Sequence, residues 1–342
     1  MDMPTAIARV VEGESFTKRE INAVMRLIMT GEASDAQIGG FLVGLRLKGE
    51  SVDEIVGAAE VMRDLAQKVQ VDSSGIVDTC GTGGSGVNKF NVSTASAFVA
   101  AAAGVKVAKH GNRAASSKSG SADLLEEAGA NIMLTPSQVA RSIETVGVGF
   151  LFAKNHHAAM KHAIGPRREM SVRTVFNLLG PLTNPAGATR QVIGVYDEAL
   201  VRPIAEVLRL LGSEHVMVVH SFDGLDEISI AAKTNVAELK DGDIKEYVVC
   251  PEDFSMVTGS LEGLKVTSAA ESLLIVRAAL NGENEVASDI VAINAGAAIY
   301  VSGQEKDFSN GVKVAQDVIG GGLATEKMKE FVDFTVQLGG AE

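Results

Sequence analysis

Cysteine is scarce in this sequence, which has only Cys80 and Cys250 among its 342 residues. Two cysteines are too few for a disulfide framework, and these two do not have the spacing of metal ligands. No apolar run approaches the roughly 20 residues that a transmembrane helix needs, so we expect no membrane partner. Asp2 and Glu12 stand where a signal peptide would have a basic flank and an apolar core. We therefore expect a cytoplasmic protein.

Basic residues are in the minority: 31 Lys and Arg stand against 43 Asp and Glu, a formal net charge of −12. A surface this acidic repels nucleic acid unless basic side chains gather locally, so we expect no nucleic-acid partner. Hydrophobic residues make up 46% of the chain and charged residues 22%, a balance typical of globular proteins. At about 150 residues per domain, the length allows two domains.

Residues 1 to about 70 show only helical patterns. Three residue pairs have the spacing of a capping box at a helix N-terminus, and apolar residues recur at helical intervals after each of them. The pairs are Thr17 with Glu20, Ser34 with Gln37, and Ser51 with Glu54. Three short amphipathic helices do not make a full core. They need a partner, which is either another part of the chain or another subunit.

From Gly75 onward, short β-prone runs alternate with helical patterns. The runs are 76–77, 105–107, 132–134, 150–152, 191–196 and 216–220. This alternation is typical of an α/β fold with a mainly parallel sheet. The region 167–185 interrupts the series with a helical pattern and could return to pack on the N-terminal helices. From about residue 240 we expect sheet and covering helices, with Asn294 and Tyr300 in structural roles.

A glycine-rich loop, Asp78-Thr-Cys-Gly-Thr-Gly-Gly-Ser-Gly86, directly follows the first predicted strand. Its backbone N–H groups could hold an anion. The spacing also fits the dinucleotide-binding pattern G-x-G-x-x-G, but that fold needs an acidic residue after the next strand, where Lys109 and His110 stand. No Gly-Lys-Ser/Thr follows, so the loop is not a Walker motif. By itself the loop fits a plain glycine turn as well as a phosphate site.

Basic and hydroxyl side chains gather around this loop. No acidic residue occurs between Asp78 and Asp123 or between Glu144 and Glu169, although both windows contain several Lys and Arg. The segments 91–94, 109–117 and 119–121 supply Ser, Thr and Asn at two consecutive strand-to-helix junctions. A solvated basic face with serine helix caps is the alternative interpretation. We favour a small polyanionic ligand at the carboxyl ends of neighbouring strands.

Two adjacent carboxylates, Asp226 and Glu227, follow the strand that ends at His220. Near a polyphosphate such carboxylates usually indicate Mg²⁺, although the pentapeptide 223–227 alone is better read as a turn with surface acids. Three histidines at 156, 157 and 162 specify a metal site poorly. Cys80 has no paired base and is expected to pack as a small residue.

These motifs together resemble the anthranilate phosphoribosyltransferase family. The resemblance is carried by Cys-Gly-Thr-Gly-Gly at 80–84, Asn-Val-Ser-Thr at 91–94, Lys-His-Gly-Asn-Arg-Ala-Ala-Ser-Ser at 109–117, Phe-Asn-Leu-Leu-Gly-Pro-Leu-Thr-Asn-Pro at 176–185 and Asp-Gly-Leu-Asp-Glu at 223–227. In order and spacing they cover the chain from about 75 to 230.

The resemblance implies two domains and a reaction. A small all-helical domain would comprise 1–72 with about 165–188, and a larger α/β domain would comprise 73–164 with about 189–342. Family members are typically homodimers joined through the helical domain. In the second step of tryptophan synthesis from chorismate, the amine of anthranilate would displace pyrophosphate from phosphoribosyl pyrophosphate. An aromatic amine is already neutral at pH 7, so no covalent nucleophile or general base is expected.

The resemblance also implies the site residues. At phosphoribosyl pyrophosphate it places Gly81, Gly84, Ser85, Lys89, Asn91, Val92, Ser93, Thr94, Lys109, His110, Gly111, Asn112, Arg113, Ala114, Ala115, Ser116, Ser117 and Ser121. It places Gly81, Asn112 and Arg167 at anthranilate, with Arg167 as a partner for the carboxylate. Ser93, Asp226 and Glu227 would hold Mg²⁺, two ions per subunit.

Two positions depart from the family's pattern. Ser85 stands where the loop usually has Asp, and Lys89 stands where a hydroxyl or apolar residue is usual. We expect substrate binding to survive, because backbone N–H groups do not depend on either side chain. Pyrimidine-nucleoside phosphorylases share this architecture and a similar helix start, Lys-Ser-Gly-Ser-x-Asp, as at 118–123. Against that alternative, Asn112-Arg113 and Asp226-Glu227 suit a metal-bound pyrophosphate leaving group. A non-catalytic, nucleic-acid-binding relative would have degraded motifs and a basic surface.

Overall fold

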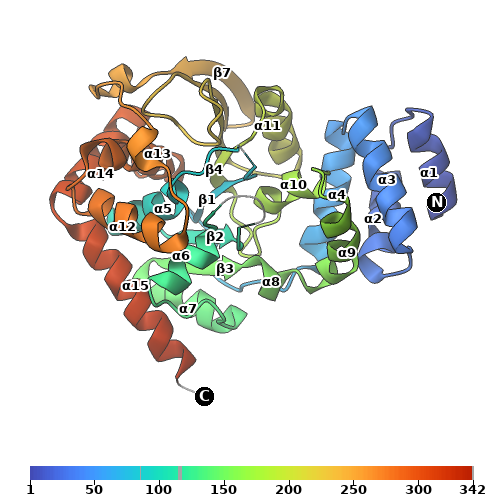
Figure 1. The fold of residues 1–342 in the computed structure, drawn as a ribbon, viewed down its shortest axis with the longest axis horizontal. Helices are drawn as coiled ribbons and strands as arrows, with labels where there is room; N and C mark the ends of the chain where they lie inside the picture. The colour runs from blue at the N-terminus through green and yellow to red at the C-terminus, as the bar shows by residue number, and fades with distance from the viewer. Residues whose placement is uncertain (85, 115–117, 341–342) are drawn as a thin grey trace.

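A seven-stranded mixed sheet forms the centre of the computed structural model, which describes residues 1–84, 86–114 and 118–340 (Figure 1). The strands are β1 (Val77–Gly81), β2 (Val107–Gly111), β3 (Val148–Phe152), β4 (Arg190–Gly194), β5 (His215–Ser221), β6 (Thr234–Lys240) and β7 (Asp243–Val249). Their order is β3-β2-β1-β4-β5-β6-β7. The first five pair in parallel, and β6 and β7 pair antiparallel. The predicted α/β class with a mainly parallel sheet is confirmed.

The predicted run 132–134 is not a strand, although the other five runs overlap β1 to β5. Ile132 and Leu134 are buried while Met133 is exposed, which gives the alternation typical of a strand. However, Ile132 packs into the core under one face of the sheet and Leu134 into a different cluster. The segment is an extended link between two helices without a partner strand among the described residues.

Alternate residues of the sheet point into separate cores, as the pleat of a strand requires. Met217 and Val219 of β5 lie in one core, and Val216 and Val218 lie in the other. The first core is covered by α5 (Val92–Ala102), α6 (Ser121–Glu127), α12 (Ala269–Leu280), α13 (Glu285–Ser302), α14 (Phe308–Gly320) and α15 (Leu323–Gly339). The second core contains α11 (Val201–Leu210) and the N-terminal helices. α7 (Pro136–Val146) packs against β3.

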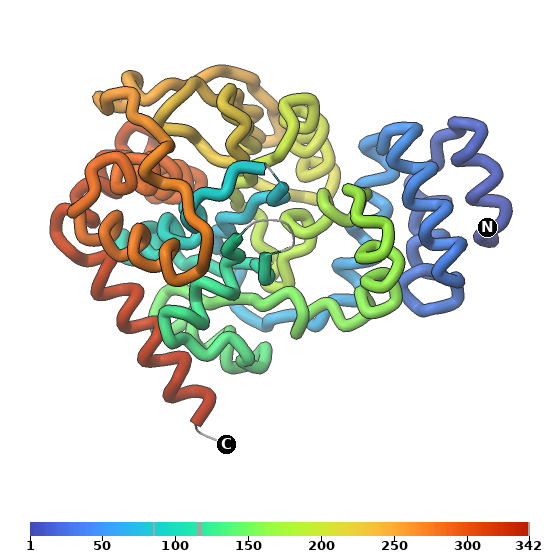
Figure 2. Tube along the Cα trace, viewed as in Figure 1, coloured from blue at the N-terminus to red at the C-terminus, as the bar shows by residue number. Residues whose placement is uncertain are grey.

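The N-terminal helices are α1 (Met3–Val11), α2 (Lys18–Thr30), α3 (Asp35–Lys48) and α4 (Val52–Leu65). All three predicted capping boxes form at α2, α3 and α4. Helix α1 was not predicted, because its cap, Asp2, has no reciprocal partner three residues later. In Figure 2 these helices lie at the right of the molecule, and the C-terminal end of α15 projects at the bottom.

The N-terminal helices find packing partners within the same chain. Helices α2 and α3 contact α9 (Lys161–Met170), and α4 contacts α10 (Phe176–Leu179) and α11. The inserted region therefore returns to the N-terminal helices, in agreement with the sequence pattern. The short helix α8 (Ala153–His156) and the turns 158–160 and 180–182 complete this connection. Within the described ranges, no helix has both the length and the apolarity to cross a bilayer.

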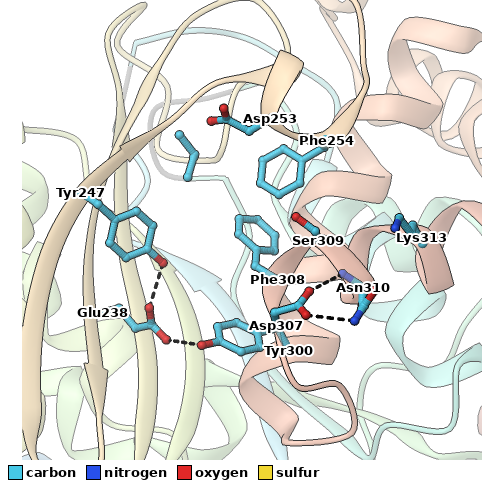
Figure 3. A pocket seen from close by; sticks show the side chains of 11 residues that line it. Glu238, Tyr247, Asp253, Phe254, Tyr300, Asp307, Phe308, Ser309, Asn310 and Lys313 are labelled. Atoms are coloured by element: carbon cyan, nitrogen blue, oxygen red, sulfur yellow. Dashed lines mark hydrogen bonds between the residues drawn. The ribbon is translucent and has the colours of Figure 1, made fainter.

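A cavity of about 560 Å³ lies over β6, β7 and the start of α14, and a network of buried polar groups forms its floor (Figure 3). Glu238 Oε1 accepts a hydrogen bond from the Tyr300 hydroxyl at 2.8 Å, and its Oε2 accepts one from the Tyr247 hydroxyl at 2.9 Å. His215 Nε2 lies 2.9 Å from Oε1. Burial alone would raise the pKa of Glu238, but the hydrogen bonds from His215 and the two tyrosines lower it to about 2.

We expect Glu238→Gln to lower the free energy of unfolding at pH 7 by about 1–2 kcal/mol, a value discounted for partial solvent exposure. Because the folded pKa lies below the ordinary value of 4.5, the carboxylate stabilises the fold above that value, and this is lost as pH falls toward about 2. The difference between wild type and variant in urea unfolding should therefore be full at pH 7 and shrink between pH 4.5 and 3. A difference independent of pH would indicate packing alone.

Candidate active site

The predicted site residues gather at the carboxyl ends of β1, β2 and β4, where open parallel sheets bind ligands. The glycine loop follows β1, the segment 109–117 includes the end of β2, and β4 ends at Gly194 beside Asp226. The chain brings these segments together from distant parts of the sequence, because β1 lies between β2 and β4 in the sheet. Of the expected positions, Ser85, Ala115, Ser116 and Ser117 lie outside the described residues.

The glycine loop depends on glycine for its backbone conformation. Gly83, Gly84 and Gly86 have φ of 65°, 81° and 78°, a region in which other residues are strained. The loop begins at a fixed point, since the Thr82 backbone N–H donates to the Gly194 carbonyl at 2.8 Å. The Thr82 hydroxyl in turn accepts from the backbone N–H of Tyr196 at 3.1 Å. The loop is therefore anchored to the end of β4.

Helix α5 begins beside this loop without a side-chain cap. Its first residue is preceded by Asn91, whose amide group is used elsewhere: Oδ1 accepts from the Ser119 and Ser272 hydroxyls at 2.7 Å each, and Nδ2 donates to the Ser119 carbonyl. In the first turn, Thr94 Oγ1 is buried and has no hydrogen-bond partner among the described residues. Uncapped N–H groups and the helix dipole make this end of α5 suitable for an anion.

A buried lysine lies beneath this helix end. Lys109 is almost fully buried, donates a hydrogen bond to the Thr79 carbonyl, and lies 3.4 Å from Ser93 Oγ. Burial lowers its pKa, while the nearby Cys80 and Asp78 act in the opposite direction. Its ammonium group is close to the Ser93 hydroxyl, to which the family resemblance gives a metal-binding role.

Asp78 organises the strands under the site. It accepts hydrogen bonds from the His110 backbone N–H at 3.0 Å and from Asn184 Nδ2 at 2.8 Å. Burial raises its pKa to about 6, against the effects of Lys109 and of these hydrogen bonds. The side chain thus joins β1, β2 and the 176–185 motif, and it acts as a support beneath the ligand site.

The carboxylates of Asp226 and Glu227 line the site together with the glycine loop and the start of α5. An added Cβ at Gly81 would lie 3.0 Å from Asp226 Oδ2, so Asp226 lies directly against the glycine loop. A small cavity is lined by Ser93, Asp226 and Glu227 together with Gly81. The three expected Mg²⁺ ligands are thus brought to one place. Lys89 Nζ lies 2.7 Å from Asp226 Oδ1 and 2.5 Å from Glu227 Oε2.

The residues present fit a magnesium ion whose remaining ligands come from a phosphate substrate. Among the described residues there is no group of three or more His, Cys, Asp or Glu that could hold a metal. Two carboxylates and a hydroxyl nevertheless match Mg²⁺, which is commonly bound by one or two carboxylates together with substrate phosphates and water. Glu227 Oε2 is buried, and its contact among the described residues is the ion pair with Lys89 Nζ, a cation in the place where a metal ion would bind.

Backbone contacts fix the position of these acids. Asn294 of α13 accepts from the Ile228 backbone N–H at 3.0 Å and donates to the Ile228 carbonyl at 2.8 Å. Asp223 accepts from the Ser229 hydroxyl at 2.6 Å and holds the turn before the pair. The predicted structural role of Asn294 therefore lies directly beside the site.

The side chains of Arg113 and His110, which the resemblance places at phosphoribosyl pyrophosphate, are engaged with other protein groups. Arg113 pairs with Asp123 at 3.2 Å and with Glu126 on α6. The His110 ring is buried, with Nδ1 3.1 Å from the Gly180 carbonyl and its centroid 5.2 Å from that of His157. Burial, followed by His157, lowers the pKa of His110 well below its usual range. The His110 ring is therefore packed away from the cavity, and its backbone N–H is already donated to Asp78.

The helical region contributes two arginines. The Arg167 guanidinium lies 5.1 Å from the centre of the Phe176 ring, and it forms no ion pair or hydrogen bond within the described ranges. Burial lowers its pKa, so an anionic partner would be favourable there. Arg173 donates to the Gly84 carbonyl and stacks on Tyr196 at 4.3 Å, which brings the inserted region against the glycine loop.

Several residues of the site had not been predicted. Ser272, Arg173 and Gly194 are separated from their partners by many residues, whereas Ser119 belongs to the segment 119–121 that the sequence singled out. Arg173 and Asn184 flank or belong to the motif at 176–185, which was the available signal. Cys80 behaves as expected for a packed thiol, since burial raises its pKa. His156 bonds to the Gln67 carbonyl through Nδ1 at 2.9 Å.

Comparison with known proteins agrees with this geometry. The helical bundle domain of a glycosyl transferase family matches residues 4–66, and its a/b domain matches residues 73–325. The anthranilate phosphoribosyltransferase of Hahella chejuensis is 61% identical, covering 98% of this chain and 98% of its own length. That of Marinomonas sp. is also 61% identical, covering 98% of this chain and 97% of its own.

Solved structures agree as well. A crystal structure of anthranilate phosphoribosyltransferase from Thermus thermophilus superposes with a TM-score of 0.91 at 42% identity, covering 96% of this chain and 99% of that one. The enzyme of Saccharomyces cerevisiae in complex with phosphoribosyl pyrophosphate and Mg has a TM-score of 0.89 at 25% identity, covering 98% of both chains.

Proposed function

We propose that this chain acts by Mg²⁺-assisted departure of pyrophosphate, without a covalent nucleophile. The chain belongs to the anthranilate phosphoribosyltransferase family. It transfers the phosphoribosyl group of 5-phosphoribosyl 1-pyrophosphate to the amine of anthranilate. The reaction gives N-(5-phosphoribosyl)anthranilate and belongs to tryptophan biosynthesis. The observation that carries the mechanism is one cavity lined by Ser93, Asp226 and Glu227 at the uncapped start of α5.

Phosphoribosyl pyrophosphate would bind across this helix end. The glycine loop and the segment 91–94 would hold its phosphates, the latter through the backbone N–H groups of Ser93 and Thr94, and the charge of Lys109 would lie behind them. Ser93, Asp226 and Glu227 would hold Mg²⁺, two ions per subunit, and bound Mg²⁺ stabilises the charge that develops on departing pyrophosphate. The Saccharomyces cerevisiae enzyme, which binds both, supports this assignment.

Anthranilate would enter from the helical side. The guanidinium of Arg167, which has no ion pair with any described residue, suits its carboxylate, and Asn112 and Gly81 would complete the contact. Since the amine is neutral at pH 7, positioning it next to the anomeric carbon is the main requirement. Burial raises the pKa of Cys80 and so disfavours its thiolate, and the lowered pKa of the buried His110 makes its ring a weak base.

Removal of divalent ions tests the mechanism. Transfer can be followed by the change in anthranilate fluorescence. Chelation with EDTA should reduce the rate to background, and excess Mg²⁺ should restore it fully, because the leaving group is a multiply charged anion. Transfer that continues unchanged in the chelator would contradict the proposed metal assistance.

Arg167→Gln should raise the KM for anthranilate by roughly 10–100-fold, since a charge-assisted hydrogen bond contributes about 1.5–3 kcal/mol. The KM for phosphoribosyl pyrophosphate should change by less than about twofold. The neighbouring Arg168→Gln is the matched control, because Arg168 is exposed and equally basic. If both variants change the two KM values alike, Arg167 does not bind anthranilate.

The domain division and the assembly are further parts of the proposal. We assign 1–72 with about 165–188 to the helical domain, and 73–164 with about 189–342 to the α/β domain. Val43 and Leu47 lie one turn apart on α3 and are 38% and 83% exposed, an apolar face that a second copy would cover in a homodimer. Sedimentation equilibrium should give twice the 35.6 kDa chain mass, and Leu47→Glu should shift it toward the monomer.

A cytoplasmic location is also proposed. Both Cys80 and Cys250 are free thiols, which is usual in a reducing compartment. Cell fractionation checks this, and recovery in an oxidising compartment would contradict it.

A further inference from the structure

Lys89 is held between the two carboxylates that the proposed mechanism assigns to magnesium. Its ammonium nitrogen lies 2.7 Å from Asp226 Oδ1 and 2.5 Å from Glu227 Oε2. The three side chains are each only 10–12% exposed. The ammonium thus contacts one oxygen of each acid in a largely enclosed place.

The backbone around Lys89 is fixed by the segment 264–266, which lies far along the sequence. Residues 89 and 265 form an isolated antiparallel bridge. The Phe90 backbone N–H donates to the Leu264 carbonyl at 3.1 Å, and the Val266 backbone N–H donates to the Asn88 carbonyl at 2.9 Å. Any movement of the ammonium must therefore come from the four-carbon side chain, while the backbone stays in place.

The Lys89 ammonium and a divalent ion cannot bind Asp226 Oδ1 and Glu227 Oε2 at the same time. Mg²⁺ binds carboxylate oxygens at 2.0–2.1 Å, and an ammonium nitrogen 2.5–2.7 Å from the same oxygens occupies the space that the ion would need. Two carboxylates this close repel each other without a cation. Lys89 supplies that cation within the chain itself.

We propose that Lys89 is a displaceable internal cation that occupies the Asp226–Glu227 pair in the ligand-free enzyme and leaves it when a divalent ion arrives with the phosphate substrate. The proposal rests on the metal assignment made above. The pyrophosphate group would compensate the displaced ammonium, since lysine is a compact point charge on a flexible stem. Lys89 would then couple metal binding to substrate binding and make metal binding weak in the absence of substrate.

Binding of Mn²⁺ to the protein without substrate, followed by electron paramagnetic resonance, tests the proposal without relying on activity. Lys89→Met, which keeps most of the length of the unbranched side chain but removes its charge, should bind Mn²⁺ at least about tenfold more tightly than wild type. Lys89→Gln is the second variant in case Met perturbs the fold. Lys89→Arg, which keeps the positive charge, should remain within about threefold of wild type.

Two controls separate displacement from a general change in charge. Lys265→Met removes a neighbouring positive charge whose side chain is exposed, and it should leave the Mn²⁺ affinity within about twofold of wild type. Adding Glu227→Gln to Lys89→Met should remove the gain. With phosphoribosyl pyrophosphate present, the advantage of Lys89→Met should shrink, because the substrate has already displaced the ammonium in wild type.

The outcomes are distinguishable. Equal Mn²⁺ affinity of wild type, Lys89→Met and Lys89→Gln, with all three weakened by Glu227→Gln, would overturn the role of Lys89 and leave the metal site intact. An equal gain from Lys265→Met would also overturn it, since bulk charge would then explain the effect. Binding that Glu227→Gln does not affect in any background, even with substrate present, would overturn the metal assignment itself.

Discussion

Replacement of the carboxylate pair by amides, Asp226→Asn with Glu227→Gln, should reduce kcat/KM by at least about 10³-fold. The amides keep the shape of the side chains but lose the negative charges that would bind Mg²⁺ beside Ser93. Pyrophosphate would then leave without adequate charge stabilisation. Each single variant should lose less than the double variant, because one carboxylate still offers a ligand.

This loss is measured from anthranilate fluorescence at saturating and limiting Mg²⁺. Asp223→Asn is the matched control in the same loop, because its carboxylate is used by the Ser221 and Ser229 hydroxyls; this change should lower stability and leave the dependence on Mg²⁺ unaltered. Far-ultraviolet circular dichroism verifies that the double variant is folded. A folded double variant with near-normal kcat/KM would contradict the role of both acids.

Gly194→Ala should damage stability and catalysis together. An added Cβ would lie 1.6 Å from the Asp226 carbonyl oxygen, far inside any allowed contact, so the backbone of Asp226 must move. We expect a loss of about 2–3 kcal/mol in the free energy of unfolding. Because Gly194 also accepts from the Thr82 N–H, the glycine loop should move too, and kcat/KM should fall by about 100-fold or more.

Urea unfolding and steady-state kinetics measure these two effects. Gly263→Ala is the control, since an added Cβ there has no heavy atom within 4 Å and the backbone does not have a positive φ. It should change either quantity little. If Gly194→Ala unfolds at the wild-type urea concentration and retains normal kcat/KM, then the close approach of β4 to Asp226 does not matter for the site.

Local chemistry explains why much of the fold could be predicted. Three of the four N-terminal helices, α2 to α4, begin at capping boxes that involve residues three positions apart, and each box forms as expected. The prediction of a strand at 132–134 was wrong, because alternating apolar residues show that one side of a segment is buried but do not show whether a partner strand exists. A strand requires a neighbour, and that information is not local.

The site followed the same division. Glycine, hydroxyl and carboxylate motifs identified the segments that meet at the carboxyl ends of the parallel strands. The contacts between these segments could not be predicted, because the contacting residues are far apart in the sequence. Lys89 and Asp226 are 137 residues apart, and Asn91 and Ser272 are 181 apart. Arg113 lies in a segment rich in basic residues and was therefore expected to bind phosphate. Its guanidinium instead donates a hydrogen bond to Glu126, thirteen residues later. Which of several acids a cation meets is decided only by the folded chain.

The outer strand β7 limits how copies of this molecule can assemble. An unpaired sheet edge is a template for another strand, and charged side chains on the edge discourage such pairing. Asp243, Lys245 and Glu246 are exposed along β7, and Glu246 is bound to Arg202 at 2.7 Å. A continuous intermolecular sheet is thereby disfavoured at this edge. The proposed association through the helical domain would leave the carboxyl ends of the parallel strands open, so that each copy would keep its own entrance for substrates.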